Sequence, residues 1–259
     1  MRAKSAASKS VSRKFDSRAK LEAELKARDE FFSAVAHELR NPLNALHLTL
    51  TGLLRAHSNA TPLSSEQVIS RINRASAQVS RLAKLVDDML DVSRISAGRL
   101  QLQIEEFDAA ASLAEVVERM KDPANPSQIS LSAPPSLMIR GDLGRFAQIA
   151  SNLLSNAILY GKQNPIEVRL TSDTATISLQ VVDRGIGIAE KDQQRIFERF
   201  QKLSIDDPNV RFGFGLWVAR EVVRALQGGI TVSSKPGMGS TFTVKLPKLN
   251  SAGTVAPSE

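Results

Sequence analysis

The chain has 259 residues, 42 % of them hydrophobic, which is enough to bury a core in one large domain or two modest ones. It contains no cysteine, which excludes disulfides, thiolate metal sites and cysteine nucleophiles. The net charge of +7 comes largely from residues 1–28, with nine Lys and Arg against three Asp and Glu; the other 25 and 24 nearly cancel, so nucleic-acid binding is not expected.

Residues 1–28 form a basic N-terminal arm, either a solvated tail or the start of a helix. No apolar run approaches the roughly 18 residues of a membrane helix, and the N-terminus lacks the apolar stretch of a secretory signal. We therefore expect a cytoplasmic protein with no membrane segment in this chain.

The next segment, residues 29–97, has helical periodicity. Apolar residues recur at steps of three and four from Phe32 to Leu53 and again from Val68 to Met89. Turn-forming residues separate the two runs at 57–67. The pattern predicts an antiparallel helical hairpin, and because one hairpin cannot enclose a core, two are expected to form a four-helix bundle in a homodimer.

The first of these helices carries an unusual arrangement in "FFSAVAHELRNPLNAL". At about 100° per residue, His37 points away from the apolar seam, with Glu38 beside it and Asn41 one turn further on. An exposed imidazole can act as a nucleophile near neutral pH, and an adjacent carboxylate can take its proton. Pro42 removes one helical hydrogen bond, so we expect a kink. An ordinary surface histidine remains the alternative at this point.

The period changes after Gly98, which predicts a second domain over residues 98–248. "RLQLQIE" at 99–105 and the segments 166–170 and 177–181 alternate as strands with one buried face. Residues 142–161 and 215–226 read as helices, and "GGITVSS" with "GSTFTVKLP" predicts a closing hairpin. The domain is expected to be an α/β sandwich, followed by a disordered tail at 249–259, so that the whole chain is α+β.

Two polar features of this domain suggest a nucleotide. Asn152 and Asn156 lie four residues apart beside the apolar face of their helix, although Asn is a mediocre helix former. Their amide oxygens can serve Mg²⁺ and the phosphates that it carries. Asp183 ends a predicted strand, where its carboxylate can accept a hydrogen bond from an exocyclic amine.

Glycine pairs follow these polar residues. Gly185 and Gly187 come directly after Asp183, and Gly213 and Gly215 precede a predicted helix. Glycine lets a backbone close on a ligand, and the free N–H groups of a helix N-terminus can meet phosphate. Each pair alone is a weak signal, and an ordinary turn explains the first pair better; the asparagine pair and the two glycine pairs in this order, behind an exposed helical histidine, favour a nucleotide site.

On these residues the sequence resembles the sensor histidine kinases of two-component signalling. "FSAVAHELRNPL" is similar to their phosphoacceptor motif and "NLLSNAILY" to their asparagine motif. "DRGIG", "IFERF" and "GFGL" resemble their first glycine, phenylalanine and second glycine motifs. The resemblance covers about residues 30–247, and it implies a dimerisation and phosphotransfer domain followed by a GHKL-type ATP-binding domain.

The resemblance implies a role for each residue of the first motif. His37 would accept the γ-phosphoryl group of ATP, with Glu38 acting as the base that readies its nitrogen. The phosphoryl group would then pass to an aspartate of a response-regulator receiver domain. Asn41 matches the position that helps to place water when such a kinase dephosphorylates its partner, and the Pro42 kink would let the helix bend.

The resemblance also implies a site for ATP and Mg²⁺. Asn156 matches the Mg²⁺ ligand, Asn152 the phosphate side, and Asp183 the carboxylate that recognises adenine. A lid is expected at roughly residues 201–212. The other residues implied in nucleotide binding are Tyr160, Gly185, Gly187, Ile188, Lys202, Gly213, Gly215 and Leu216.

Two departures from the family pattern affect the expected rate. Leu159 stands where the family usually carries lysine, and Arg211 stands where the second glycine motif usually opens with glycine. We expect Arg211 to replace part of the missing positive charge, because a guanidinium can grip phosphate with two hydrogen bonds. Two alternatives remain: a nucleotide-binding pseudokinase that acts as a dimeric scaffold, and an ATPase of another type with the same ATP-binding fold.

Overall fold

The structure is a computed structural model, which describes residues 33, 35–36, 39–56, 63–121, 129–198 and 214–248. By its packing the chain divides into two compact units, Met1–Asp87 and Asp88–Glu259. None of the helices within the described residues combines the length and the apolar character needed to span a bilayer.

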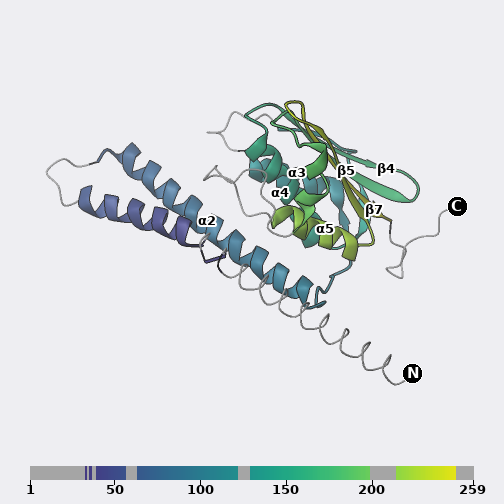
Figure 1. Ribbon diagram of the computed structural model, residues 1–259, viewed down its shortest axis with the longest axis horizontal. Helices are drawn as coiled ribbons and strands as arrows, with labels where there is room; N and C mark the ends of the chain where they lie inside the picture. The colour runs from purple at the N-terminus through teal and green to yellow at the C-terminus, as the bar shows by residue number, and fades with distance from the viewer. Residues whose placement is uncertain are drawn as a thin grey trace, which may run out of the picture. The chain divides into compact units, whose positions relative to one another are not determined.

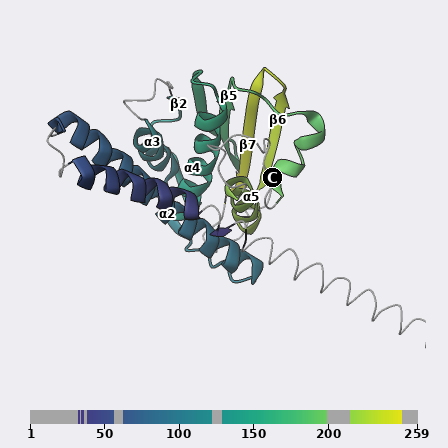
Figure 2. The same cartoon turned by 60° about the vertical axis from the view of Figure 1, so that its left-hand side comes forward.

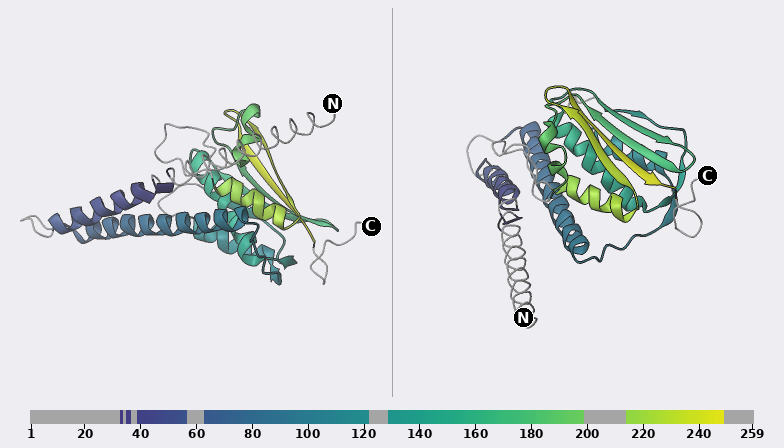
Figure 3. Two further views of the ribbon diagram at one scale, coloured as in Figure 1. Left: turned by 60° about the horizontal axis from the view of Figure 1, so that its bottom comes forward. Right: turned by 45° about the vertical axis from the view of Figure 1, so that its right-hand side comes forward.

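The first unit contains the predicted helical hairpin. Residues 39–56 are helical through Pro42, and they lie beside the first turns of α2 (Ser65–Ser96), as Figure 1 and the left panel of Figure 3 show. The Arg71 guanidinium donates to the Gly52 carbonyl at 2.9 Å and so joins the two helices. The hairpin prediction is therefore confirmed over the described residues.

The position at which α2 begins is explained by two hydrogen bonds and not by the spacing of its apolar residues. The Gln67 amide donates to the Ser64 hydroxyl at 3.2 Å, and the Ser64 amide donates to the Gln67 side chain at 3.1 Å. This reciprocal pair is a capping box, which satisfies N–H groups at the helix terminus. The helix accordingly begins at Ser65, three residues before the first apolar position that the sequence predicted.

The end of α2 is set by Gly98, as predicted. Gly98 has φ of 64°, its amide donates to the Ile95 carbonyl, and the Arg99 amide donates to the Arg94 carbonyl at 2.8 Å. This pairing is a Schellman motif, in which glycine takes the left-handed position that stops the helix. The strand predicted at 99–105 is wrong over most of its length, because residues 99–104 pair with no strand and β1 is Glu105–Asp108.

A five-stranded sheet forms the second unit together with three helices. Its strand order is β2-β4-β5-β7-β6, with only β2 and β4 parallel, and β1 pairs separately with β3. The helices lie on one face of the sheet, as Figure 2 and the right panel of Figure 3 show. The elements are α3 (Ala109–Met120), α4 (Leu143–Tyr160), α5 (Gly215–Ala225), β2 (Ile129–Ser132), β3 (Met138–Gly141), β4 (Ile166–Ser172), β5 (Thr176–Asp183), β6 (Gly229–Lys235) and β7 (Gly239–Pro247).

The core lies between this sheet and its helices, as the alternation predicted. Every apolar residue of the two predicted strand patterns is at most 3 % exposed, and so is the apolar face of α4. Strand side chains with period two therefore meet helix side chains with a period near 3.6. These buried residues are Phe146, Ile149, Leu153, Ala157, Ile166, Val168, Leu170, Ile177, Leu179 and Val181. The sequence reading missed α3, β2 and β3, which are short or carry less regular patterns.

A buried ion pair joins the last turns of α2 to the first turn of α4 inside the second unit. The Asp91 carboxylate is 6 % exposed and accepts from the Arg145 guanidinium at 2.7 Å and from the Gln148 amide at 2.5 Å. Arg145 also donates to Gln148 at 2.8 Å, which closes the network. The backbone amide of Gln103 donates to Asp142, the N-cap of α4, at 2.9 Å. The first turn of α4 thus holds both the end of α2 and the segment after it.

We expect Asp91→Ala to lower the free energy of unfolding of the second unit by about 2 to 4 kcal/mol, because it leaves the Arg145 charge buried without its carboxylate. Urea unfolding followed by the fluorescence of Trp217 measures this, since Trp217 is the only tryptophan and is buried in α5. Asp87→Ala, one turn earlier and exposed, is the matched control. An Asp91→Ala protein within about 0.5 kcal/mol of the control would contradict the prediction.

Candidate nucleotide site

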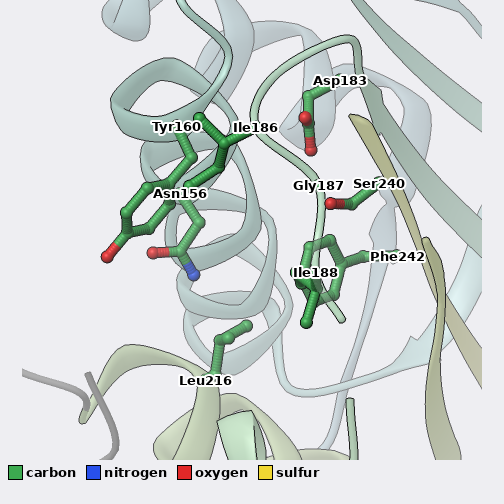
Figure 4. Close-up of a pocket in the computed structure, with 9 residues that line it drawn as sticks. All are labelled: Asn156, Tyr160, Asp183, Ile186, Gly187, Ile188, Leu216, Ser240 and Phe242. Carbon is green, nitrogen blue, oxygen red and sulfur yellow. The ribbon is translucent and has the colours of Figure 1, made fainter. Parts of the chain in front are cut away.

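One pocket of the second unit gathers most of the predicted nucleotide residues. Asn156 and Tyr160, one turn apart on α4, face the residues at the end of β5 across the pocket in Figure 4. Leu216, in the first turn of α5, closes the lower side of that view. The lining residues are Asn156, Tyr160, Asp183, Ile186, Gly187, Ile188, Leu216, Ser240 and Phe242.

Close backbone contacts hold the loop after β5 in place. The Ile186 amide donates to the Tyr160 carbonyl at 3.2 Å, and a Cβ on Gly185 would lie 1.9 Å from that carbonyl oxygen. Gly187 has φ of 66°, and a Cβ there would lie 2.0 Å from the Lys235 carbonyl oxygen. Only glycine fits at both positions, so in the free protein these two residues shape the pocket by letting backbones meet.

Asp183 is a buried carboxylate beside this loop. It is 5 % exposed, and burial raises its pKa above the ordinary value, although the Gly185 amide and the amide and hydroxyl of Ser240 donate to it and oppose the rise. The Gly185 amide lies 2.9 Å from Oδ1. A carboxylate offers about four lone-pair sites, so three protein donors leave about one for a ligand.

Asn152 and Gly215 meet each other outside the pocket lining. The Asn152 side chain is 1 % exposed and donates to the Gly215 carbonyl at 3.1 Å, which joins α4 to the first turn of α5. A Cβ on Gly215 would have its nearest contact at 3.6 Å, an ordinary distance. The structure therefore gives Asn152 a role in positioning α5, and it leaves room for a methyl group at Gly215.

The sequence reading missed three lining residues: Ile186, Ser240 and Phe242. Ser240 stands opposite Asp183 in the pairing of β5 with β7, which explains why its hydroxyl reaches the carboxylate. Phe242 packs edge-on against Phe197 of "IFERF", with ring centroids 6.3 Å apart. For Ile186 the available signal was its place within "DRGIG", and for Ser240 and Phe242 it was only the two-residue spacing that puts both on one face of a strand.

Several predicted residues lie outside the described ranges or outside the pocket. His37, Glu38, Lys202, Gly213 and Arg211, with the predicted lid at 201–212, lie outside the described residues. Asn41 is exposed on the helix formed by residues 39–56, in the first unit. Leu159 is half-buried, on the same turn of α4 as Tyr160.

Two family models match the chain in succession. Residues 27–98 match the His Kinase A (phospho-acceptor) domain, and residues 141–250 match the histidine kinase-, DNA gyrase B-, and HSP90-like ATPase domain. The chain belongs to the sensor histidine kinases. The resemblance found in the sequence and the predicted α+β class are thereby confirmed, with the helical region preceding the ATPase domain.

Relatives of this histidine kinase chain agree with that assignment. The sensor-like histidine kinase SenX3 of Mycolicibacterium smegmatis is 32 % identical over 228 residues, covering 85 % of this chain and 58 % of SenX3. The sensor protein EvgS of Escherichia coli K12 is 29 % identical over 230 residues, covering 85 % of this chain and 19 % of EvgS. The chain therefore spans less than two thirds of either relative.

Solved structures of histidine kinases are also similar. The Acinetobacter baumannii histidine kinase AdeS has a TM-score of 0.60 and 27 % identity, covering 83 % of this chain and 98 % of that one. Full-length ShkA, solved in complex with AMPPNP, has a TM-score of 0.60 and 26 % identity, covering 88 % of this chain and 47 % of that one.

The residues of the pocket fit an adenine nucleotide with Mg²⁺. Asp183 has about one acceptor site left, which matches a single N–H of an exocyclic amine. Asn156 places an amide in the same lining, and amide oxygens are among the ligands that Mg²⁺ accepts. The room at Gly215 lies at the N-terminus of α5, and the N-terminal end of a helix dipole favours an anion.

We expect Gly215→Ala and Gly185→Ala to separate nucleotide binding from folding. Gly215→Ala should keep the free energy of unfolding within about 0.5 kcal/mol, because its methyl group meets only ordinary contacts, yet weaken ADP binding at least about fivefold by standing where phosphate approaches. Gly185→Ala should cost about 3 kcal/mol or more, because its Cβ would overlap the Tyr160 carbonyl. Urea unfolding and calorimetric titration with ADP measure both. Equal stability of the two variants would contradict the expectation.

We expect ADP affinity to fall on acidification at a higher pH than an ordinary aspartate would cause. The pKa of Asp183 is raised by burial, so protonation removes the acceptor for the adenine amine as pH falls through that raised pKa. The free energy of unfolding should change in the opposite direction. Because the pKa of Asp183 is raised in the folded protein, protonated Asp183 stabilises the fold at low pH, and this stabilisation is lost as the pH rises through the raised pKa. Titration with ADP between pH 8 and about 4.5 tests this. The Asp183→Asn variant should bind ADP weakly, with an affinity that depends less on pH. A wild-type affinity that depends on pH as weakly as that of the variant would refute the expectation.

Proposed function

We propose that this chain is the catalytic part of a histidine protein kinase that phosphorylates His37 from Mg-ATP and passes the phosphoryl group to an aspartate of a response-regulator receiver domain. The observation that carries the proposal is the pocket in which Asn156, Tyr160 and Asp183 come together in the second unit. The phosphoacceptor family model over residues 27–98 supports the histidine as the acceptor.

In this proposal each side of the pocket binds one part of the nucleotide. Asp183 accepts a hydrogen bond from the adenine amine, and the Tyr160 ring packs against the base. The first turn of α5, with Gly215 and Leu216, receives the phosphates. Asn156 would hold Mg²⁺, whose charge offsets that of the phosphates. Relatedness to ShkA, whose structure contains AMPPNP, is consistent with this assignment.

His37 accepts the phosphoryl group in this proposal, with Glu38 as the base. An imidazole nitrogen attacks the γ-phosphorus while the bond to the β-phosphate oxygen breaks, and ADP leaves with that electron pair. Glu38 takes or orients the proton on the second ring nitrogen, which keeps the attacking nitrogen unprotonated. Asn41, which is exposed and lies four residues after His37 in the sequence, is assigned to placing the water that removes the phosphoryl group from the receiver domain.

A homodimer is the assembly that the exposed seam of the first unit supports. Five residues of the predicted seam keep between 46 and 53 % of their surface exposed in the single chain. Apolar surface arranged in this way is usually covered by a partner. We propose that a second copy covers it and completes a four-helix bundle. The five residues are Leu43, Leu50, Ile72, Val79 and Val86.

Leu159 favours a second candidate, the nucleotide-binding pseudokinase. Its apolar side chain lies three residues beyond Asn156 on α4, where a lysine would bring positive charge towards the phosphates. Arg211 is proposed to supply part of that charge. A chain that binds ADP through Asp183 but transfers no phosphoryl group would be a scaffold, whereas one that releases phosphate without becoming labelled would be an ATPase of another type.

We expect His37→Ala to abolish labelling of the protein by [γ-³²P]ATP with Mg²⁺ while ADP affinity stays unchanged, because His37 is assigned only to the transfer. The label on the wild type should be acid-labile, as a phosphoramidate is. His47→Ala, at an exposed histidine on the helix formed by residues 39–56, is the matched control and should label normally. Label that persists in His37→Ala would refute the acceptor assignment.

A further inference from the structure

Ser234, on β6, makes hydrogen bonds to two segments that line the nucleotide pocket, the loop after β5 and the start of β7, although it does not line the pocket itself. Its hydroxyl accepts from the Ile188 amide at 2.8 Å and can donate to the Gly239 carbonyl at 2.7 Å. The Ser240 hydroxyl lies 3.1 Å away. Ile188 and Ser240 both line the pocket, on the side of Asp183 that faces Asn156 and Tyr160 in Figure 4.

The hydrogens of the two serine hydroxyls can be counted. Each has one hydrogen and two acceptor sites. The Ser234 hydrogen serves the Gly239 carbonyl or the Ser240 oxygen, and one Ser234 lone pair receives the Ile188 amide. The hydrogen of Ser240 is then available to Asp183, to which the Ser240 hydroxyl donates. Hydrogen bonds in such a chain polarise one another towards the charged acceptor.

Gln193, which lies between the short 3-10 helices η1 (Glu190–Asp192) and η2 (Arg195–Phe197), holds the same strand and loop. Its side-chain amide donates to the Ser234 carbonyl at 2.8 Å and to the Ile188 carbonyl at 3.3 Å. Gly187, next to Ile188, lies against the Lys235 carbonyl at a distance that only glycine tolerates. The loop after β5 and the β6–β7 hairpin are therefore joined at several atoms, with the Ser234 hydroxyl among them.

We propose that Ser234 is a positioning residue for adenine recognition: its hydroxyl ties the backbone of Ile188 to the start of β7, which presents Ser240 to Asp183. The inference rests on the proposed role of Asp183 as the adenine contact. Ser234 itself touches no nucleotide. It sets the position of Ile188, which lines the pocket, relative to the Asp183 carboxylate that accepts from the adenine amine.

A side chain that only stabilised the fold would have a different signature. Loss of stability alone lowers the affinity for every nucleotide by the same factor, because it acts on the folded population. Loss of the Ser234 hydroxyl instead displaces groups that read the base. The effect should be larger for adenine, whose amine donates to Asp183, than for hypoxanthine, which has a carbonyl oxygen at that position.

The test compares ADP and IDP by calorimetric titration of the full chain; the two bases differ in the amine or carbonyl at C6 and in the hydrogen that hypoxanthine carries on the neighbouring N1. We expect Ser234→Ala to weaken ADP binding about tenfold, the size of one buried hydrogen bond, and IDP binding by about threefold or less. Ser234→Thr keeps the hydroxyl and should restore the wild-type ratio. Ser233→Ala, the exposed neighbour on β6, is the matched control and should change neither affinity.

Unchanged ADP affinity in Ser234→Ala, or equal weakening of ADP and IDP, would overturn the proposal. Trp217 fluorescence and circular dichroism establish that each variant is folded at the titration temperature. If Ser234→Ala does not fold, Ser234→Cys takes its place under the same two criteria, since a thiol keeps the size with weaker hydrogen bonding. Asp183→Asn is measured in parallel. An ADP-to-IDP ratio unchanged by Asp183→Asn would refute the adenine role of Asp183 itself, which is a separate outcome.

Discussion

The pocket depends on one backbone contact, where the loop after β5 meets the end of α4. The Ile186 amide donates to the Tyr160 carbonyl, and Gly185 lies so close to that oxygen that no side chain could stand there. This contact brings Asp183 and Ile188 opposite Asn156 and Tyr160. Without it, α4 and β5 would still pack through their apolar faces, but no lined space would separate their polar residues.

Helix α4 connects this contact with the rest of the second unit. Its first turn holds the end of α2 through Arg145 and Gln148, and its middle holds α5 through Asn152. Its last two turns carry Asn156 and Tyr160 into the pocket. Because one rigid helix makes all these contacts, a change at the α2 junction and a change at the nucleotide act on the same element. The buried Asp91 network adds geometric specificity at that junction, since buried ion pairs contribute little net stability against apolar replacements.

The sequence predicted the parts of this structure that have strong periodicity or a motif. The buried faces of α4, β4 and β5 and the closing hairpin follow from apolar spacing, and six of the nine lining residues follow from motifs. The strand expected at 99–105 failed because alternation alone does not provide a pairing partner, and only residues from Glu105 onward pair with β3. Ser234 and Ser240 could not be predicted, because their roles depend on a hairpin turn that brings β7 back against Asp183. The sequence identified Asn152 as a candidate but could not predict its contact with the Gly215 carbonyl, since a four-residue spacing does not show which neighbour the side-chain amide meets.

Asp183 shows how binding and stability are linked at this site. Its carboxylate is buried, and the raised pKa means that the donors from Gly185 and Ser240 do not fully offset the loss of water. The free domain therefore carries a cost at neutral pH, which the surrounding core of strand and helix side chains tolerates. A ligand amine that completes the acceptor sites removes part of that cost, so nucleotide binding should stabilise the domain beyond the mass-action effect of its phosphates. By the same reasoning, we expect the residues that aim donors at Asp183 to influence base choice more than folding, because they set how much of the cost of burying the carboxylate is left for the base to relieve.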